Sequence, residues 1–299
     1  MNTNSNVYTV IYTTLVVVVV AAVLAFVAMK LGPSQQANEK AETLRQMMVA
    51  AQVGNADDIY AAKNAEVLKL YADNIEKAFT INLDGEQTGE LSIALDNIEL
   101  VGNLKPVDKA IKDENADNLP VYQFKGGISV IPVYGAGLWG PIWGYIAIEA
   151  DGQTIKGVYF DHASETPGLG AKIKDEPWFR EKFSGKKAAF AQFPIFTIAK
   201  NAEADGAENA VDAITGATMT SKGLNAAVNT WLEAYKQFFG KTILGGKCHK
   251  EGGCCGKHEH AEGECCCGGG EGHCEEGHEG CCKDVNEACC NETTKAEEE

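Results

Sequence analysis

The chain has 299 residues, which is enough for one substantial domain or two small ones. Its formal net charge is −16, and all 11 cysteines lie from Cys248 onward. The acidity argues against nucleic acid or an anionic lipid surface as a partner, and the thiol-free body is compatible with an oxidising compartment.

The first segment, residues 1–30, is predicted to be a transmembrane anchor. No charged residue occurs before Lys30, and residues 9–29 form an apolar run. About 21 residues of helix cross a hydrocarbon core of roughly 30 Å. The alternative is a cleaved signal peptide, but this run is long for one and no basic segment precedes it. Lys30, Lys40 and Arg45 follow the span, and by charge bias alone they would place the body in the cytoplasm.

A helical stalk is predicted over residues 31–90. Residues 35–53 have helical composition, with apolar side chains at helical spacing. Residues 65–79 repeat this pattern, with Leu68, Tyr71, Ile75 and Phe79 on one face. We therefore expect two helices that pack on the domain that follows.

The body, residues 91–244, begins with a change of pattern. Short apolar, β-branched runs punctuated by Gly, Asp and Pro are typical of strands, and they occur at 98–104, 127–133, 143–150 and 154–160. Asp151 and Gly152 are a hairpin signal between the last two runs.

Two helices and one more strand are predicted in the second half of the body. Residues 175–183 predict a helix with Pro177 near its first turn, and residues 188–200 predict a strand. Residues 221–239 carry one apolar face and predict a long amphipathic helix. The fold class is therefore α+β, with a largely antiparallel sheet and flanking helices.

The stretch DAITGATMTSKG, residues 212–223, places four hydroxyls at the start of that long helix. One interpretation is structural: Thr220 and Ser221 precede the apolar periodicity by a few residues and suit N-caps. The other is a phosphate site, because the first amides of a helix are unpaired and its N-terminus is electropositive. Thr218, just ahead of the cap, would then carry a phosphate ester made by another enzyme.

Two further stretches are marked by glycines. Residues 134–145, YGAGLWGPIWGY, are either a glycine-rich hairpin or an aromatic wall that a planar ligand approaches closely. Residues 161–172, DHASETPGLGAK, lack the spacing of a phosphate loop. We interpret His162 and Glu165 in this stretch as solvated loop residues.

In combination, these blocks resemble the C subunit of the sodium-translocating NADH:quinone reductase. The resemblance extends over nearly all of residues 1–247, and residues 212–218 fit the family's flavinylation pattern, Asp-x-x-Ser/Thr-Gly-Ala-Thr. It implies that a separate flavin transferase joins FMN by its phosphate to Thr218. The remaining residues expected at the FMN site are Asp212, Thr215, Gly216, Ala217, Leu138, Trp139, Thr166, Gly168 and Leu169.

The same resemblance implies a flavoprotein subunit of a sodium-pumping complex that takes electrons from NADH to ubiquinone. Electrons would pass through covalent FMN, from an iron centre to a flavin in neighbouring subunits. The subunit would cross the bacterial inner membrane once, with the FMN domain in the periplasm, and we follow this over the charge bias. No Gly-x-Gly-x-x-Gly stands between a strand and a helix, as dinucleotide binding requires, so we expect NADH to bind elsewhere. The alternative family is the G subunit of a related ferredoxin:NAD oxidoreductase complex.

The segment 245–299 is of low complexity, rich in Gly, Glu, Cys and His, and is expected to lack a packed core. Soft thiolates bind Zn or Cu(I), so an anchored metal-binding protein that acts through this tail is the competing function. An oxidisable tail without a metal is equally compatible with the composition. The candidate ligands are Cys254, Cys255, Cys265, Cys266 and Cys267.

Overall fold

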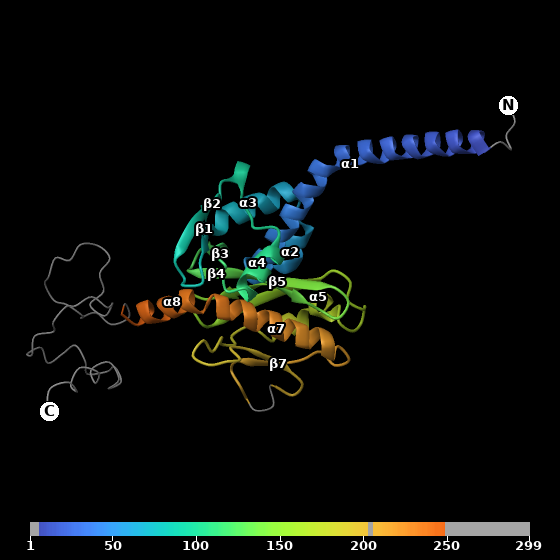
Figure 1. Ribbon diagram of the computed structural model, residues 1–299. Coiled ribbons are helices and arrows are strands. Elements are labelled where there is room, and N and C mark those ends of the chain that lie inside the picture. Colours follow the sequence, from blue (N-terminus) through green and yellow to red (C-terminus); the bar gives the residue numbers. More distant parts are fainter. Residues whose placement is uncertain (1–5, 203–205, 249–299) are drawn as a thin grey trace, which may run out of the picture. The chain divides into compact units, whose positions relative to one another are not determined.

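A six-stranded antiparallel sheet organises the part of the chain that the computed structural model describes, residues 6–202 and 206–248 (Figure 1). Its spatial order is β2-β1-β3-β4-β5-β6, and every neighbouring pair is antiparallel. The strands are β1 (Ile75–Ile81), β2 (Gln87–Leu91), β3 (Leu119–Phe124), β4 (Ile128–Ala136), β5 (Pro141–Ile148) and β6 (Ile155–His162).

Both faces of this sheet are buried. Successive side chains of a strand point to opposite faces, so neighbouring residues of one strand belong to different clusters. On β5, Tyr145 and Ala147 belong to one hydrophobic cluster, whereas Ile146 and Ile148 belong to another. Apolar residues therefore occupy consecutive positions in the central strands, and helices cover each face.

The first face is covered by three helices, α1 (Asn6–Ala50), α2 (Ala56–Ala61) and α3 (Asn64–Asn74). The last ten residues of α1 bury Leu44, Met47 and Met48 completely in this cluster. The apolar window nearer its N-terminus has no residue buried, and the helix is long and apolar enough to cross a membrane. In Figure 1 this part of α1 runs clear of the sheet.

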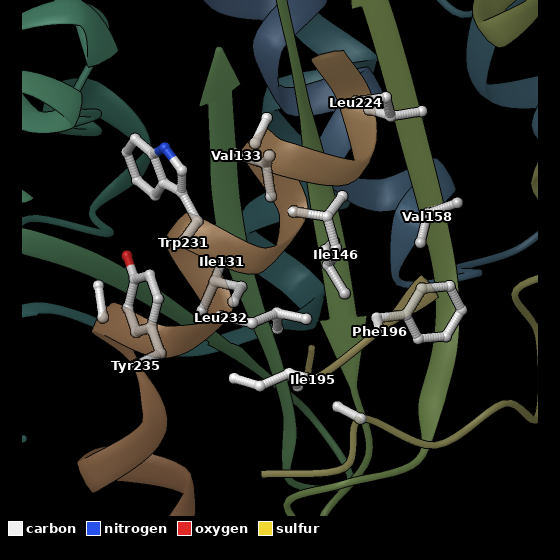
Figure 2. Close-up of a cluster of buried hydrophobic side chains, with 14 of the residues drawn as sticks. Ile131, Val133, Ile146, Val158, Ile195, Phe196, Leu224, Trp231, Leu232 and Tyr235 are labelled. Atoms are coloured by element: carbon white, nitrogen blue, oxygen red, sulfur yellow. The ribbon is translucent and has the colours of Figure 1, made fainter. Parts of the chain in front are cut away.

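The second face is covered by helices that follow later in the chain. They are α4 (Leu104–Lys112), α5 (Lys172–Asp175), α6 (Pro177–Glu181), α7 (Thr218–Ala234) and α8 (Lys236–Cys248). Leu224, Trp231 and Leu232 of α7 lie over Ile131 of β4 and Ile146 of β5 (Figure 2). The predicted amphipathic helix is thus present, but it ends at Ala234 and α8 begins after Tyr235.

A short parallel pair, β7 (Thr197–Ala199) and β8 (Ala210–Asp212), lies beyond α7. Two side chains of α7 attach it: Asn225 Oδ1 accepts from the Ile198 amide at 2.7 Å, and Asn229 accepts from the Phe196 amide at 3.1 Å. β8 leads directly into the hydroxyl-rich turn, so this attachment fixes where that turn begins.

The α+β class and the antiparallel sheet are confirmed, but two sequence predictions of local structure are wrong. The helix expected over 65–79 ends at Asn74, because Ile75–Ile81 pairs with both β2 and β3. The strand expected over 98–104 is absent among these described residues. Asn103 caps α4 instead, with its side chain accepting from the Lys105 amide.

Further strands differ from the prediction. The strand expected over 188–200 is reduced to Thr197–Ala199, and three strands, β1, β2 and β3, were not predicted as strands. The hairpin at Asp151-Gly152 is confirmed: Gly152 has φ +74°, and β5 and β6 pair on either side. The candidate metal ligands Cys254 to Cys267 lie outside the described residues.

Close contact between α7 and β4 depends on Gly223. A Cβ at this position would overlap the carbonyl oxygen of Ala136. We expect Gly223→Ala to lower the free energy of unfolding by about 1–3 kcal/mol, because the helix must move off the strand. Urea unfolding of the detergent-solubilised chain measures this. Gly102→Ala is the control, because a Cβ there meets nothing within 4 Å; equal stability of the two variants would contradict the prediction.

Candidate functional site

Three segments that are far apart in sequence meet beside the N-terminus of α7. They are the β4–β5 connection around Leu138, the loop around Glu165 that follows β6, and the turn at Gly216–Thr218. These are the three glycine-marked stretches singled out in the sequence. The sheet brings the first two together, because β5 pairs with both β4 and β6.

A cavity of about 170 Å³ lies between these segments. Its lining residues are Leu138, Glu165, Thr166, Leu169, Gly170, Gly216, Ala217, Thr218, Met219 and Thr220. Trp139, Gly168, Asp212 and Thr215, which we also expected at the site, are not among them. The cavity is smaller than the roughly 300–1,000 Å³ that encloses a small molecule, so it holds only part of a larger ligand.

Three large apolar side chains of the cavity wall stay exposed: Leu138, Leu169 and Met219, at 49%, 43% and 56%. Trp139, next to Leu138, is 67% exposed. Large apolar side chains that stay this exposed are typical of a surface that contacts a ligand or a partner.

The four hydroxyls of the turn have different environments. Thr220 and Ser221 are buried, at 1% and 2% exposure. Thr215 is exposed but does not line the cavity, whereas Thr218 is exposed and lines it. Thr220 also lines the cavity but is buried, so Thr218 is the one residue of the four that is both exposed and part of the cavity wall.

The expected capping roles of Thr220 and Ser221 are wrong. The helix starts earlier than the apolar periodicity suggests, with Ala217 as N-cap and Thr218 as the first helical residue. Thr220 Oγ1 donates to Glu165 Oε2 at 2.6 Å, and Ser221 Oγ accepts from the Ile214 amide at 3.3 Å. Tertiary contacts thus use both hydroxyls, and no side chain caps α7.

Unpaired amides remain at this helix end. Among the described residues, none accepts a hydrogen bond from the amides of Thr218, Met219 or Thr220. The turn before them contains Gly216 at φ +84°, a conformation that glycine adopts readily. Exposed, unpaired amides at a helix N-terminus form an electropositive site for an anion such as phosphate.

Glu165 is not a solvated loop residue as expected from the sequence, since it is only 5% exposed. Its Oε1 accepts from the Trp139 amide at 2.9 Å, and its own amide donates to Nδ1 of His162 at 3.1 Å. Burial raises the pKa of Glu165, but hydrogen bonds from Thr220, Trp139 and Leu138 outweigh it and hold the pKa below its usual value.

This lowered pKa predicts a pH dependence of stability. A carboxyl group with a depressed folded-state pKa stabilises the protein above its unfolded pKa, about 4.3 for Glu, and this contribution is lost as pH falls through the folded pKa. We expect the unfolding free energy of the wild type to fall below about pH 4 more steeply than that of Glu165→Gln. Urea unfolding between pH 7 and 3 measures both slopes, and parallel curves would contradict the assignment.

Asp212, at the end of β8, lies beside α6 rather than in the cavity. Its Oδ2 is 3.9 Å from Nζ of Lys182, and Lys182 Nζ lies 5.7 Å from the ring centroid of Trp178. In the described part of the chain, no group of His, Cys, Asp or Glu is arranged to hold a metal ion.

Residues 137–233, which include all three segments of the site, match the FMN-binding domain family. The C subunit of the Na(+)-translocating NADH-quinone reductase of Pasteurella multocida is 33% identical over 186 residues, covering 57% of this chain and 69% of the relative. The same subunit of Vibrio parahaemolyticus is 31% identical and covers 57% and 72%. The chain belongs to this C-subunit family.

Solved structures of family members share the fold. The C subunit from Parabacteroides distasonis superposes with a TM-score of 0.56 at 31% identity, covering 69% of this chain and 94% of that one. NqrC from Shewanella oneidensis gives 0.54 at 30% identity, covering 70% and 99%. The family resemblance stated from the sequence is thereby confirmed, and the relatives are single subunits rather than complete enzymes.

Proposed function

We propose that this chain is the subunit of a Na(+)-translocating NADH-quinone reductase that carries electrons through FMN bound to Thr218 by a phosphoester. The observation that carries the proposal is the position of Thr218. Among the four hydroxyls of a stretch that fits the flavinylation pattern, it combines exposure with a place in the cavity wall. Membership of the C-subunit family and the match to the FMN-binding domain support the same cofactor.

The residues present fit FMN in three respects. The unpaired amides of Thr218 and Met219 would hold the phosphate, and Gly216 keeps the turn open beside it. The exposed apolar side chains of the cavity wall, Leu138 and Leu169, suit the flavin ring, which the cavity is too small to enclose. Bound FMN supplies reversible transfer of single electrons, a chemistry that amino-acid side chains at this site lack.

Attachment forms a bond between Oγ of Thr218 and the phosphorus of FMN. An activated flavin nucleotide must supply the FMN, so its pyrophosphate bond breaks and a nucleoside monophosphate leaves. The hydroxyl proton passes to a base. No described side chain is hydrogen-bonded to the Thr218 hydroxyl, which supports a separate flavin transferase as the source of the base. Asp212 and Thr215, both outside the cavity, are then residues that the transferase recognises or that support the turn.

We propose the electron-transfer partners from the family resemblance. The donor would be an iron centre and the acceptor a flavin, each held by a neighbouring subunit, while NADH and ubiquinone bind elsewhere in the complex. The exposed apolar side chains at the cavity support this arrangement, because a flavin ring at the surface can approach a redox group in another chain.

The test is peptide mass mapping of the chain made together with its flavin transferase. We expect an FMN adduct on the peptide that contains Thr218, with fragment ions that place it on this residue. An unmodified chain, or an adduct on Thr215, would overturn the proposed attachment.

The N-terminal helix supports a single-pass anchor in the bacterial inner membrane. We propose that the FMN domain lies in the periplasm, following the family rather than Lys30, Lys40 and Arg45. A cysteine introduced at the exposed residue Asn201, in a chain shortened before Cys248, tests the side. Labelling by an impermeant thiol reagent in cells with a permeabilised outer membrane supports the periplasm, and labelling only after lysis would contradict it.

A further inference from the structure

The buried carboxylate of Glu165 has no role in the function proposed above. It lies in the cavity wall, and both of its oxygens accept hydrogen bonds from other segments. Oε1 accepts from the Trp139 amide in the β4–β5 connection, and Oε2 accepts from Thr220 in the first turn of α7. A single side chain therefore joins all three segments of the site.

Two glycines leave room for this carboxylate. A Cβ on Gly170 would lie 2.5 Å from Glu165 Oε2 and 2.6 Å from Thr220 Oγ1. A Cβ on Gly137 would likewise overlap Glu165 Oε1. Neither glycine has a positive φ, so their small size, rather than backbone conformation, is what the position of Glu165 requires.

Further hydrogen bonds join the residues next to Glu165 to the same neighbouring segment, around Trp139. Ser164 Oγ donates to the Trp139 carbonyl at 3.0 Å, and the Ala163 amide donates to the Pro141 carbonyl at 3.0 Å. These bonds hold the Glu165 loop to the β4–β5 connection and to the first residue of β5, but they do not reach α7. The bond to Thr220 is the hydrogen bond in this group that extends the connection to the helix carrying Thr218.

We propose that Glu165 is a positioning residue for flavin attachment. Its carboxylate fixes the first turn of α7 against the Leu138–Trp139 segment, so that the Thr218 hydroxyl and the unpaired amides face the cavity before the flavin arrives. This role rests on the proposed attachment to Thr218. It assigns Glu165 no proton transfer and no contact with the reacting phosphorus.

The chemistry of the side chain allows a graded test. In Glu165→Gln, the amide oxygen can still accept from Trp139, and the amide nitrogen can donate to Thr220 Oγ1. In Glu165→Ala, the Trp139 amide and the Thr220 hydroxyl lose their acceptor. Gly170→Ala keeps the carboxylate but displaces it, so the Trp139 amide and the Thr220 hydroxyl lose their acceptor although Glu165 is unchanged.

The first measurement is hydrogen exchange of the full chain in detergent, purified from cells that lack the transferase. We expect the Trp139 amide in Glu165→Ala and Gly170→Ala to exchange at least about tenfold faster than in wild type, because hydrogen bonds to charged groups are strong. Glu165→Gln should lie between, and the control Gly102→Ala should match wild type.

The second measurement is the initial rate of FMN attachment to these proteins by purified transferase, followed by intact mass. We expect roughly tenfold slower attachment for Glu165→Ala and Gly170→Ala, with partial rescue in Glu165→Gln. Leu232→Ala is the control for stability alone, because it removes core volume about 20 Å along α7 from Thr218 and leaves the carboxylate in place.

Unchanged exchange at Trp139, or attachment in Glu165→Ala as fast as in Leu232→Ala, would overturn the positioning role. Failure of the proposed function looks different. If the wild type carries its adduct on a residue other than Thr218, attachment to Thr218 is wrong, while the exchange comparison still decides whether Glu165 orders the turn.

Discussion

Replacing Thr218 with Ala is expected to remove covalent FMN completely while the domain still folds. The side chain is exposed at the first position of α7, so its loss costs little packing. The only other exposed hydroxyl of the turn, Thr215, lies outside the cavity, and the hydroxyls of Thr220 and Ser221 are buried and hydrogen-bonded. No other hydroxyl of the turn can therefore replace it without movement of the helix start.

The measurement is intact mass of the variant made together with the transferase, with absorbance of the denatured chain as a second reading. Thr218→Ser keeps a hydroxyl at the same position and should retain some attachment, and Thr215→Ala should still carry the adduct on Thr218. Far-ultraviolet circular dichroism shows whether each variant is folded. Covalent FMN persisting in folded Thr218→Ala would overturn the assignment and make Thr215 the next candidate.

Replacing Trp231 with Ala is expected to cause the largest loss of stability in this fold. Trp231 is fully buried between α7 and the sheet (Figure 2), and its indole nitrogen donates to the Tyr134 carbonyl at 2.9 Å and to Asp108 at 3.2 Å. The substitution leaves a cavity and two acceptors without their donor. We expect the free energy of unfolding to fall by roughly 3–5 kcal/mol.

Trp231→Phe separates the two contributions, since it keeps most of the apolar volume and loses the donor. We expect it to cost about 1–3 kcal/mol. Urea unfolding followed by circular dichroism is the measurement, because the substitution removes a fluorescent reporter. A loss in Trp231→Ala no greater than that in Trp231→Phe would show that packing volume at this position contributes little.

Local sequence patterns were sufficient to predict the elements whose buried residues form a continuous apolar run or recur at helical spacing. β4, β5 and β6 are apolar runs with turn residues at their ends, and α7 carries its apolar face at helical spacing. The long apolar N-terminal helix likewise follows from an uncharged stretch of sufficient length. In each case the pattern agrees with the final environment, so propensity and tertiary packing favour the same structure.

Other segments were decided by tertiary pairing. Residues 75–79 continue the helical spacing of Leu68 and Tyr71, yet they form a strand because β2 and β3 pair with them on both sides. Residues 98–103 have strand composition but no partner strand within the described chain, and the Asn103 cap starts α4 instead. Composition does not specify which strands are available as neighbours, so it could not separate these cases.

For the site, too, some features could be predicted from the sequence and others only from the tertiary structure. The hydroxyl-rich turn and the two glycine-marked stretches could be recognised from the residues alone, and family resemblance made Thr218 the candidate for FMN. The folded chain was needed to show that Thr220 and Ser221 are buried rather than capping, and that Glu165 lies in the cavity wall. Glu165 and Thr220 are 55 residues apart, and their hydrogen bond forms only after the sheet and α7 have packed together, so no local pattern could reveal it.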